Sequence, residues 1–303
     1  MQLNSCIIQL VELAMNSLKK FKAGAFDLSF IDNQNAGKPV CLVIGSALFY
    51  SRSFNEKFEE SYRMIYLDHR GFGSVTGEIS ADDYRLKVIL QDIENFRLAN
   101  NLGKICIMGH SAHGYMALSY AHKFQNWVSS VCIVAMGPSH GIHMSDAEEL
   151  WKETAAPGRK RSFEMDMAKL ENEMRVKMPN QFVLFCKAMR AKSWVDFDKD
   201  ISHLWEGVEA FMPALDYLYG EVFRDIRVEE LIKDLDKPVL MVLGKMDYQV
   251  APHWTWNSLK GMFKQLTFRV FENSSHNPQV EESSLFFSEF QSWFSMYGLN
   301  EIE

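Results

Sequence analysis

One stretch of the sequence decides the fold: residues Ile105–Leu118, which read ICIMGHSAHGYMAL. A short apolar run leads into Gly-His-Ser at 109–111, and a helix-forming run follows directly. A tight turn from strand to helix strains the backbone of the serine and needs small neighbours. The same turn aims the helix N-terminus, with the N–H of Ala112, at charge developing on a bound oxygen. The stretch therefore predicts a strand, a nucleophilic Ser111 and a helix in succession.

The position two residues after Ser111 departs from the G-x-S-x-G pattern of such turns. It holds His113, and the glycine comes one residue later, at Gly114. A side chain at this position crowds the turn. We therefore expect either a slightly different start of the helix or packing of His113 against a neighbouring strand. Tuning of the site by the imidazole is a further interpretation.

Apolar runs on both sides of this stretch predict the rest of a sheet. They are short, and they lie at 40–44, 64–67, 105–108, 131–134, 239–243 and 266–271. Helical patterns occur at 82–100 and 112–123, and a last helix is predicted at 281–296. Continuous apolar strands separated by helices are typical of a mostly parallel sheet with helices on both faces.

The character of the sequence changes between residues 138 and 235. Strand-like runs disappear there, and the segment is rich in Met, Trp, Glu and Lys, with helical spacing of its apolar residues. The strand pattern returns after Pro238. We therefore predict an α/β core built from residues 1–137 and 236–303, interrupted by a helical cap at 138–235.

Two further strand ends carry residues that can complete a catalytic site with Ser111. The run at 239–243 continues as Gly-Lys-Met-Asp, which puts Asp247 at the carboxyl edge of the sheet, where ligands meet open α/β sheets. His276 follows the run at 266–271 on a loop. Taken alone, each could be a turn-capping carboxylate or a solvated imidazole. Together they have the chain order of a Ser-Asp-His triad, in which the histidine moves the proton and the aspartate fixes its tautomer.

These segments resemble the α/β-hydrolase superfamily, and within it the proline iminopeptidase-like branch. Residues 66–74 read YLDHRGFGS, similar to the D-x-R-G-x-G-x-S stretch of that branch. Residues 275–282 read SHNPQVEE, similar to its S/G-H-x-P-x-x-E/D ending. The resemblance covers residues 25–137 and 236–298. It implies the α/β-hydrolase fold with an inserted helical cap, and hydrolysis through an acyl-serine intermediate.

The loop that forms the oxyanion hole departs from this family. Relatives usually carry His-Gly-Gly-Pro-Gly, whereas residues 44–48 read IGSAL. Alignment of Gly45 with the family glycine makes the backbone N–H groups of Ser46 and Ala112 the oxyanion donors. A backbone donor survives a change of side chain, so the hole can persist. The lost histidine and proline nevertheless weaken the prediction of iminopeptidase activity.

The resemblance also implies candidate substrate-binding residues. In iminopeptidases, acidic residues of the cap hold the free amino terminus of the substrate. The corresponding candidates here are Glu206, Glu209, Asp216 and Glu221. Ordinary solvated helix faces are the alternative interpretation of these acids. We also expect His110, directly before the serine, to contact substrate.

Three functions remain open from the sequence. The first is hydrolysis of a small ester or amide, with an N-terminal proline or other small residue favoured by the resemblance. The second is a carboxylesterase or lactonase acting on an uncharged acyl group, indicated by the aromatic and Met side chains of the cap. The third is a ligand-binding protein of low turnover on a hydrolase scaffold, suggested by His113 and by the changed oxyanion loop. A small molecule or short peptide is the expected partner in each case.

Composition and motif spacing argue against other classes. A net charge of −7 argues against a nucleic-acid partner, and no apolar stretch reaches the roughly 20 residues that span a bilayer. His140 and His143 lack the partners of a metal site, and Gly71 and Gly73 lack the spacing of a dinucleotide site. We expect no metal and no cofactor. Nothing in the sequence specifies an oligomeric state.

Cysteines and termini favour the cytoplasm. Five cysteines are an odd count, and three of them lie in apolar runs that predict buried strands, so a reducing compartment fits best. Residues 6–18 are apolar but interrupted by polar residues, which predicts an amphipathic surface helix rather than a signal peptide. The basic run at 159–161 is interpreted as a solvated loop.

Overall fold

The computed structural model describes residues 17–176 and 178–300, and its strands form one sheet. The strands are β1 (Lys19–Ala23), β2 (Phe26–Asp32), β3 (Val40–Gly45), β4 (Arg63–Asp68), β5 (Ser74–Val75), β6 (Ile105–His110), β7 (Val128–Val134), β8 (Val239–Gly244) and β9 (Leu266–Phe271). Their order is β1-β2-β4-β3-β6-β7-β8-β9, with β5 paired to β2. Along this order the pairs from β4 to β9 are parallel, and the pairs β1–β2, β2–β4 and β2–β5 are antiparallel. The predicted, mostly parallel sheet is confirmed.

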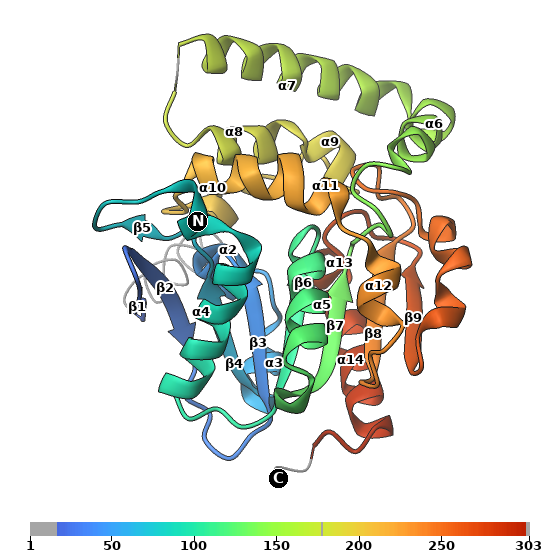
Figure 1. The fold of residues 1–303 in the computed structure, drawn as a ribbon. Helices are drawn as coiled ribbons and strands as arrows, with labels where there is room; N and C mark the ends of the chain where they lie inside the picture. Colours follow the sequence, from blue (N-terminus) through green and yellow to red (C-terminus); the bar gives the residue numbers. More distant parts are fainter. Residues whose placement is uncertain (1–16, 177, 301–303) are drawn as a thin grey trace, which may run out of the picture.

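Helices cover both faces of this sheet (Figure 1). One face is covered by α4 (Leu86–Ala99), α5 (His113–Lys123) and α12 (Val228–Ile232), and the other by α3 (Glu56–Ser61) and α14 (Ser283–Met296). Successive strand residues point to opposite faces. Leu42 and Ile44 of β3 therefore pack in the first core, while Cys41 and Val43 pack in the second. Both faces are buried, which explains why the strands are apolar throughout.

A layer of helices lies above the carboxyl ends of the parallel strands (Figure 1). It consists of α6 (Met144–Thr154), α7 (Pro157–Arg175), α8 (Gln181–Ala188), α9 (Arg190–Ser193), α10 (Met212–Tyr217) and α11 (Phe223–Asp225). Two further short helices follow the carboxyl ends of strands: α2 (Ala47–Ser51) comes after β3, and α13 (Pro278–Glu281) after β9. The described residues between 138 and 235 contain no strand. Residues 138–227 of this segment are called the cap below, because α12 packs against α5 on the sheet.

Two predicted helices are broken in the structure. The helix predicted at 82–100 begins as a 3₁₀ turn at Ala81–Tyr84, and Arg85 is extended, with a ψ of 144°, before α4 starts. The last predicted helix, at 281–296, is interrupted at Glu282, whose φ and ψ of −120° and 51° separate α13 from α14. Apolar periodicity continues across both breaks, so it does not reveal them.

The first strands of the sheet carry little sequence signal. β1 reads KKFKA and lies at the edge of the sheet, where lysines discourage pairing with other chains. β1 has no apolar run, and β2 alternates apolar with polar residues in FDLSFID, so neither is among the strands predicted from continuous apolar runs. The amphipathic helix predicted at 6–18 falls almost entirely on residues 1–16, outside the described residues.

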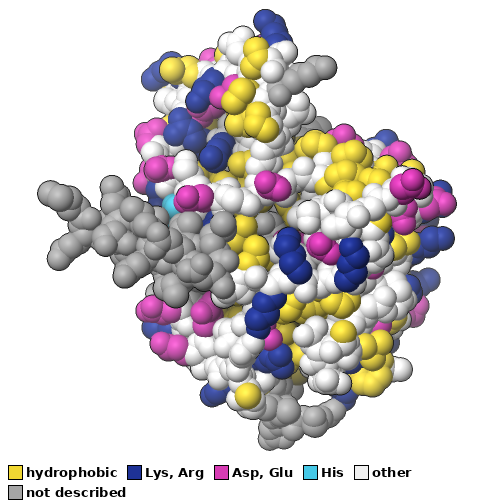
Figure 2. Space-filling view, turned by 90° about the vertical axis from the view of Figure 1, so that its left-hand side faces the viewer, with side chains coloured by type: hydrophobic (Ala, Val, Ile, Leu, Met, Phe, Trp, Pro, Cys, Tyr) yellow, Lys and Arg dark blue, Asp and Glu magenta, His cyan; other side chains and the backbone are white. Residues whose placement is uncertain are grey.

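Charges of both signs are mixed on the face nearest β1 and β5. Figure 2 shows Lys and Arg side chains interspersed with Asp and Glu there, with apolar side chains between them. Such mixing gives no extended positive field for a phosphate backbone. Among the described helices, none is both long and apolar enough to cross a bilayer.

The β6–α5 junction depends on the absence of a side chain at Gly109. A Cβ there would lie 2.3 Å from the carbonyl oxygen of His113, the first residue of α5. Real Cβ atoms do not approach backbone so closely, so strand and helix would have to separate.

We therefore predict that Gly109→Ala lowers the free energy of unfolding by about 1–3 kcal/mol, the usual cost of overpacking. Thermal or urea unfolding measures this change. Gly103→Ala is the matched control, because its Cβ would meet no atom within 4 Å. Equal stability of the two variants would contradict the close approach.

Candidate active site

Ser111 occupies a strained turn between β6 and α5. Its φ is 57°, in the left-handed region that residues with a side chain rarely adopt. Its N–H donates to the carbonyl of Val134 at 2.8 Å, and its own carbonyl accepts from the N–H of Gly114 at 2.9 Å. These backbone bonds tie the turn to β7 and to the first turn of α5, so the strain is held from both sides.

Ser111, His276 and Asp247 form one hydrogen-bonded line. His276 Nε2 lies 2.9 Å from Ser111 Oγ, and His276 Nδ1 lies 2.8 Å from Asp247 Oδ2. The second carboxylate oxygen accepts the N–H of Gln249 at 2.8 Å. Because the Asp247 carboxylate can only accept, His276 Nδ1 carries the ring proton. His276 Nε2 then has a lone pair that can accept the proton of Ser111. Both His276 and Asp247 are buried.

Glu281 holds the loop that carries His276. Its carboxylate accepts backbone N–H groups of Val195 at 2.6 Å, Ser275 at 2.8 Å and Asn277 at 3.3 Å. Burial raises the pKa of Glu281, while these three hydrogen bonds act in the opposite direction. The backbone N–H of His276 also donates to the backbone carbonyl of Ser193 at 3.1 Å, so the cap and the loop that carries His276 are bonded to each other.

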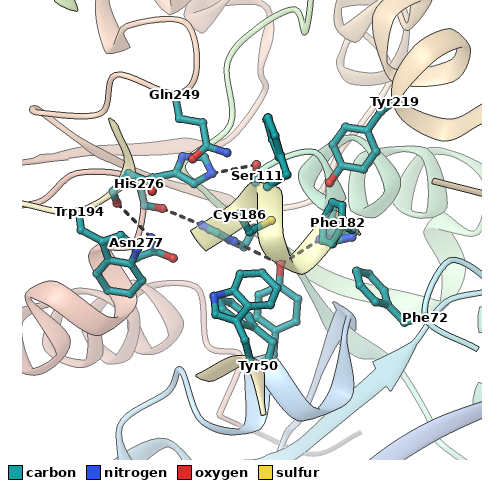
Figure 3. A pocket seen from close by; sticks show the side chains of 16 residues that line it. Tyr50, Phe72, Ser111, Phe182, Cys186, Trp194, Tyr219, Gln249, His276 and Asn277 are labelled. Atoms are coloured by element: carbon teal, nitrogen blue, oxygen red, sulfur yellow. Dashed lines mark hydrogen bonds between the residues drawn. The ribbon is translucent and has the colours of Figure 1, made fainter. Parts of the chain in front are cut away.

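An aromatic pocket lies above Ser111, between the sheet edge and the cap (Figure 3). The residues that line it are Phe49, Tyr50, Phe72, His110, Ser111, His113, Phe182, Phe185, Cys186, Ser193, Trp194, Trp205, Tyr219, Gln249, His276 and Asn277. None of these is Asp, Glu, Lys or Arg. Burial lowers the pKa of His110 to about 3, and of His113 well below its usual range, so these two rings are neutral at pH 7. The pocket wall therefore carries no full charge apart from any that His276 acquires.

The pocket is small. Its volume of about 90 Å³ is less than the roughly 150 Å³ of an engineered cavity that holds benzene. A second hollow of about 40 Å³ also reaches Ser111, and Ala112, Met136 and Met144 are among the residues that line it. Ser111 and Gln249 border both spaces.

His113 packs against the end of β3, one of the outcomes expected from the sequence. It is the first residue of α5 and is buried. Its Nδ1 lies 2.9 Å from Tyr50 Oη, and its Nε2 lies 3.1 Å from His69 Nε2. A Cβ on Gly45 would lie 3.0 Å from His113 Nδ1 and 2.1 Å from Tyr50, so the glycine leaves the room that these two side chains fill.

The structure does not bring the two predicted oxyanion donors into one pocket. Ala112 lies beside Ser111 at the start of α5. Ser46 lines a different hollow, together with Asp68, and its side chain caps α2 by accepting the Phe49 N–H at 3.3 Å. The role of the Ser46 N–H as an oxyanion donor stays a prediction.

The predicted substrate-binding residues divide into two groups. His110 lines the pocket, and its Nε2 lies 2.7 Å from the carbonyl oxygen of His276. The cap acids Glu206, Glu209, Asp216 and Glu221 are all exposed and none lines the pocket. Glu206 and Glu209 lie in the loop before α10, Asp216 lies in α10 and Glu221 in the π-helical segment Leu218–Val222, whereas the cap residues that line the pocket include Phe182, Trp194 and Trp205.

Arg159 corrects the interpretation of residues 159–161 as a solvated loop. These residues lie in α7, and Arg159 is buried. Its guanidinium donates to the carbonyls of Ala191 and Trp194 at 2.7 and 2.6 Å, and also to that of Val195. It therefore holds the segment that presents Trp194 to the pocket. Only the burial of this helix face distinguishes it from its exposed neighbours.

Tyr50 and Gln249 are pocket residues that the sequence analysis missed. Tyr50 lies on α2 in a run that reads as apolar, and Gln249 follows Asp247 by two residues. Gln249 could have been identified because it lies only two residues after the predicted catalytic Asp247, whereas no sequence pattern identifies Tyr50 as a pocket residue. Within the described residues, no group of three or more His, Cys, Asp or Glu side chains could hold a metal ion.

The chain belongs to the α/β-hydrolase fold family, whose model matches residues 37–283. It is similar to the AB hydrolase superfamily protein YclE of Bacillus subtilis (strain 168), with 35% identity over 269 residues, which is 88% of this chain and 95% of that protein. Proline iminopeptidase PfmaB of Pestalotiopsis fici is 24% identical over 237 residues, 75% of this chain and 79% of that protein.

Solved structures share the same fold. The proline iminopeptidase of Mycobacterium smegmatis superposes with a TM-score of 0.71 at 16% identity, covering 93% of this chain and 99% of that one. A thermophilic esterase from Thermogutta terrifontis gives 0.66 at 19% identity, covering 92% and 98%. At such identities the likeness concerns the fold, which hosts many activities.

We predict that Glu281→Gln reduces kcat/KM at least tenfold and lowers the melting temperature. The amide supplies one acceptor oxygen where the carboxylate supplies two, and its NH₂ group then faces a backbone N–H. Rates of hydrolysis of a p-nitrophenyl ester and thermal unfolding measure the two effects. Glu153→Gln, an exposed position on α6, serves as the control and should leave both values unchanged. A Glu281→Gln variant with wild-type kinetics would show that the loop is held by other contacts.

Proposed function

We propose that this protein is a serine hydrolase that cleaves small, uncharged esters through an acyl-Ser111 intermediate. The observation that carries the proposal is the aligned Ser111–His276–Asp247 hydrogen-bond line at the floor of a neutral aromatic pocket. The family supports hydrolase chemistry, and its relatives include esterases and proline iminopeptidases.

The geometry supports a two-step mechanism. His276 Nε2 takes the proton of Ser111 Oγ as that oxygen attacks the ester carbonyl, and Asp247 stabilises the imidazolium through Nδ1. The N–H of Ala112, at the start of α5, donates to the oxyanion. His276 returns the proton to the leaving alcohol, which departs and leaves the acyl group on Ser111. A water molecule, deprotonated by His276, then attacks the acyl carbonyl and releases the acid.

The neutral pocket favours an ester over an N-terminal peptide. A free amino terminus is a cation at neutral pH, and burying a cation without an anionic partner costs several kcal/mol. The residues lining the pocket offer no carboxylate, and the four cap acids face solvent. Aromatic walls instead suit a short, uncharged acyl chain. The iminopeptidase activity of the relatives is therefore the less favoured alternative.

We predict turnover of p-nitrophenyl acetate and butyrate, at least tenfold lower kcat/KM on the octanoate, and at least hundredfold lower kcat/KM on prolyl-2-naphthylamide. The size of the pocket limits the acyl chain, and the missing carboxylate disfavours the amine. Steady-state kinetics on the four substrates measure these differences. Preference for the prolyl amide would reject the ester assignment in favour of the iminopeptidase alternative.

A further inference from the structure

Four polar side chains form one continuous hydrogen-bonded chain along one wall of the pocket. The N–H of Gly71 donates to His69 Nδ1 at 3.0 Å, and His69 Nε2 lies 3.1 Å from His113 Nε2. The chain continues from His113 Nδ1 to Tyr50 Oη at 2.9 Å and from Tyr50 Oη to His110 Nδ1 at 3.2 Å. It ends where His110 Nε2 meets the backbone carbonyl oxygen of His276 at 2.7 Å. All four side chains are buried.

The two ends of this chain fix the position of every proton in it. At one end the backbone N–H of Gly71 can only donate, so His69 Nδ1 accepts and His69 Nε2 carries the proton. His113 Nε2 must then accept, which places the proton of His113 on Nδ1.

The other end gives the same answer independently. A carbonyl oxygen can only accept, so His110 Nε2 carries a proton and donates it to His276. His110 Nδ1 then accepts a hydrogen bond from the Tyr50 O–H. The Tyr50 oxygen in turn accepts a hydrogen bond from the N–H at His113 Nδ1. The two derivations meet at Tyr50 without conflict, and one direction runs from Gly71 to His276.

The chain is consistent only if its three linking imidazoles are neutral. Burial lowers the pKa of both His69 and His110 to about 3 and that of His113 well below its usual range. Burial likewise raises the pKa of Tyr50, so the phenol keeps its proton. A second proton on His69 or His113 would bring two donors face to face, and one on His110 would leave the Tyr50 hydroxyl proton without an acceptor in this chain.

We propose that Tyr50 is a positioning residue for the base His276, acting through His110, with His113 and His69 fixing the direction of its hydroxyl. This inference rests on the proposed function, in which His276 is the base. His110 directly precedes Ser111, so its bond to the His276 carbonyl joins the turn that carries the nucleophile to the loop that carries the base.

Removal of the Tyr50 hydroxyl would release this link. His110 Nδ1 would lose its donor, and the imidazole would then be held only by its Nε2–H bond to the His276 carbonyl, so the ring could rotate and shift that carbonyl. The base would then move relative to Ser111 Oγ, where small displacements cost much rate. Substrate contacts would change little, because the ring of Tyr50 remains on the pocket wall in Tyr50→Phe.

The decisive variants are Tyr50→Phe and Tyr120→Phe, compared on p-nitrophenyl butyrate. Each loses one buried phenol hydroxyl, but Tyr120 Oη donates to Glu94, on α4 and away from the pocket. We expect Tyr50→Phe to lower kcat at least tenfold with KM changed less than threefold, and Tyr120→Phe to keep the wild-type kcat. Equal kcat for wild type and Tyr50→Phe would overturn the inference while leaving the proposed function intact.

Nitrogen-15 NMR of the histidine rings tests the chain in the unaltered protein. We expect His113 in the Nδ1–H tautomer, and His69 and His110 in the Nε2–H tautomer. An Nε2–H tautomer of His113 would overturn the directional chain, whatever the kinetics of the variants. Failure of the wild type to turn over any ester would instead overturn the proposed function, and the tautomers would still decide whether the chain exists.

Discussion

The turn at Ser111 is the constraint on which the rest of this structure depends. A residue with a side chain is held there at a φ of 57°, and it stays there because β6, β7 and α5 all bond to the same few residues. Gly109 allows the strand and the helix to approach closely enough for this turn. The carboxyl ends of β8 and β9 then bring Asp247 and His276 to the same edge of the sheet, as parallel strands do.

Neutrality is the second property that organises the site. The protein carries a net charge of −7, yet the pocket over Ser111 is lined by aromatic rings, a thiol, amides, hydroxyls and imidazoles. Charges near the site face away from the pocket and hold its walls: Glu281 fixes the loop of His276, and Arg159 fixes the segment of Trp194. The position occupied by His113 in place of the usual glycine is part of this arrangement, since its imidazole is hydrogen-bonded on both sides.

The sequence predicted the features that depend on local patterns. Apolar runs identified the parallel strands, and the order Ser111, Asp247, His276 identified three residues that the structure brings within hydrogen-bonding distance. Features that depend on tertiary contact could not be predicted in this way. β1 has the composition of a solvated segment, so it gives no strand signal. No local pattern shows whether the four cap acids point into the pocket or into solvent. Tyr50 contacts His113 only because the fold brings together two residues that are 63 positions apart in the sequence.

The central claim is that Ser111 is an activated nucleophile, and intact mass spectrometry after treatment with a fluorophosphonate tests it most directly. The account predicts a single phosphonyl adduct on the wild-type protein and none on Ser111→Ala. An unmodified wild type, or an equal adduct on both proteins, would contradict the claim.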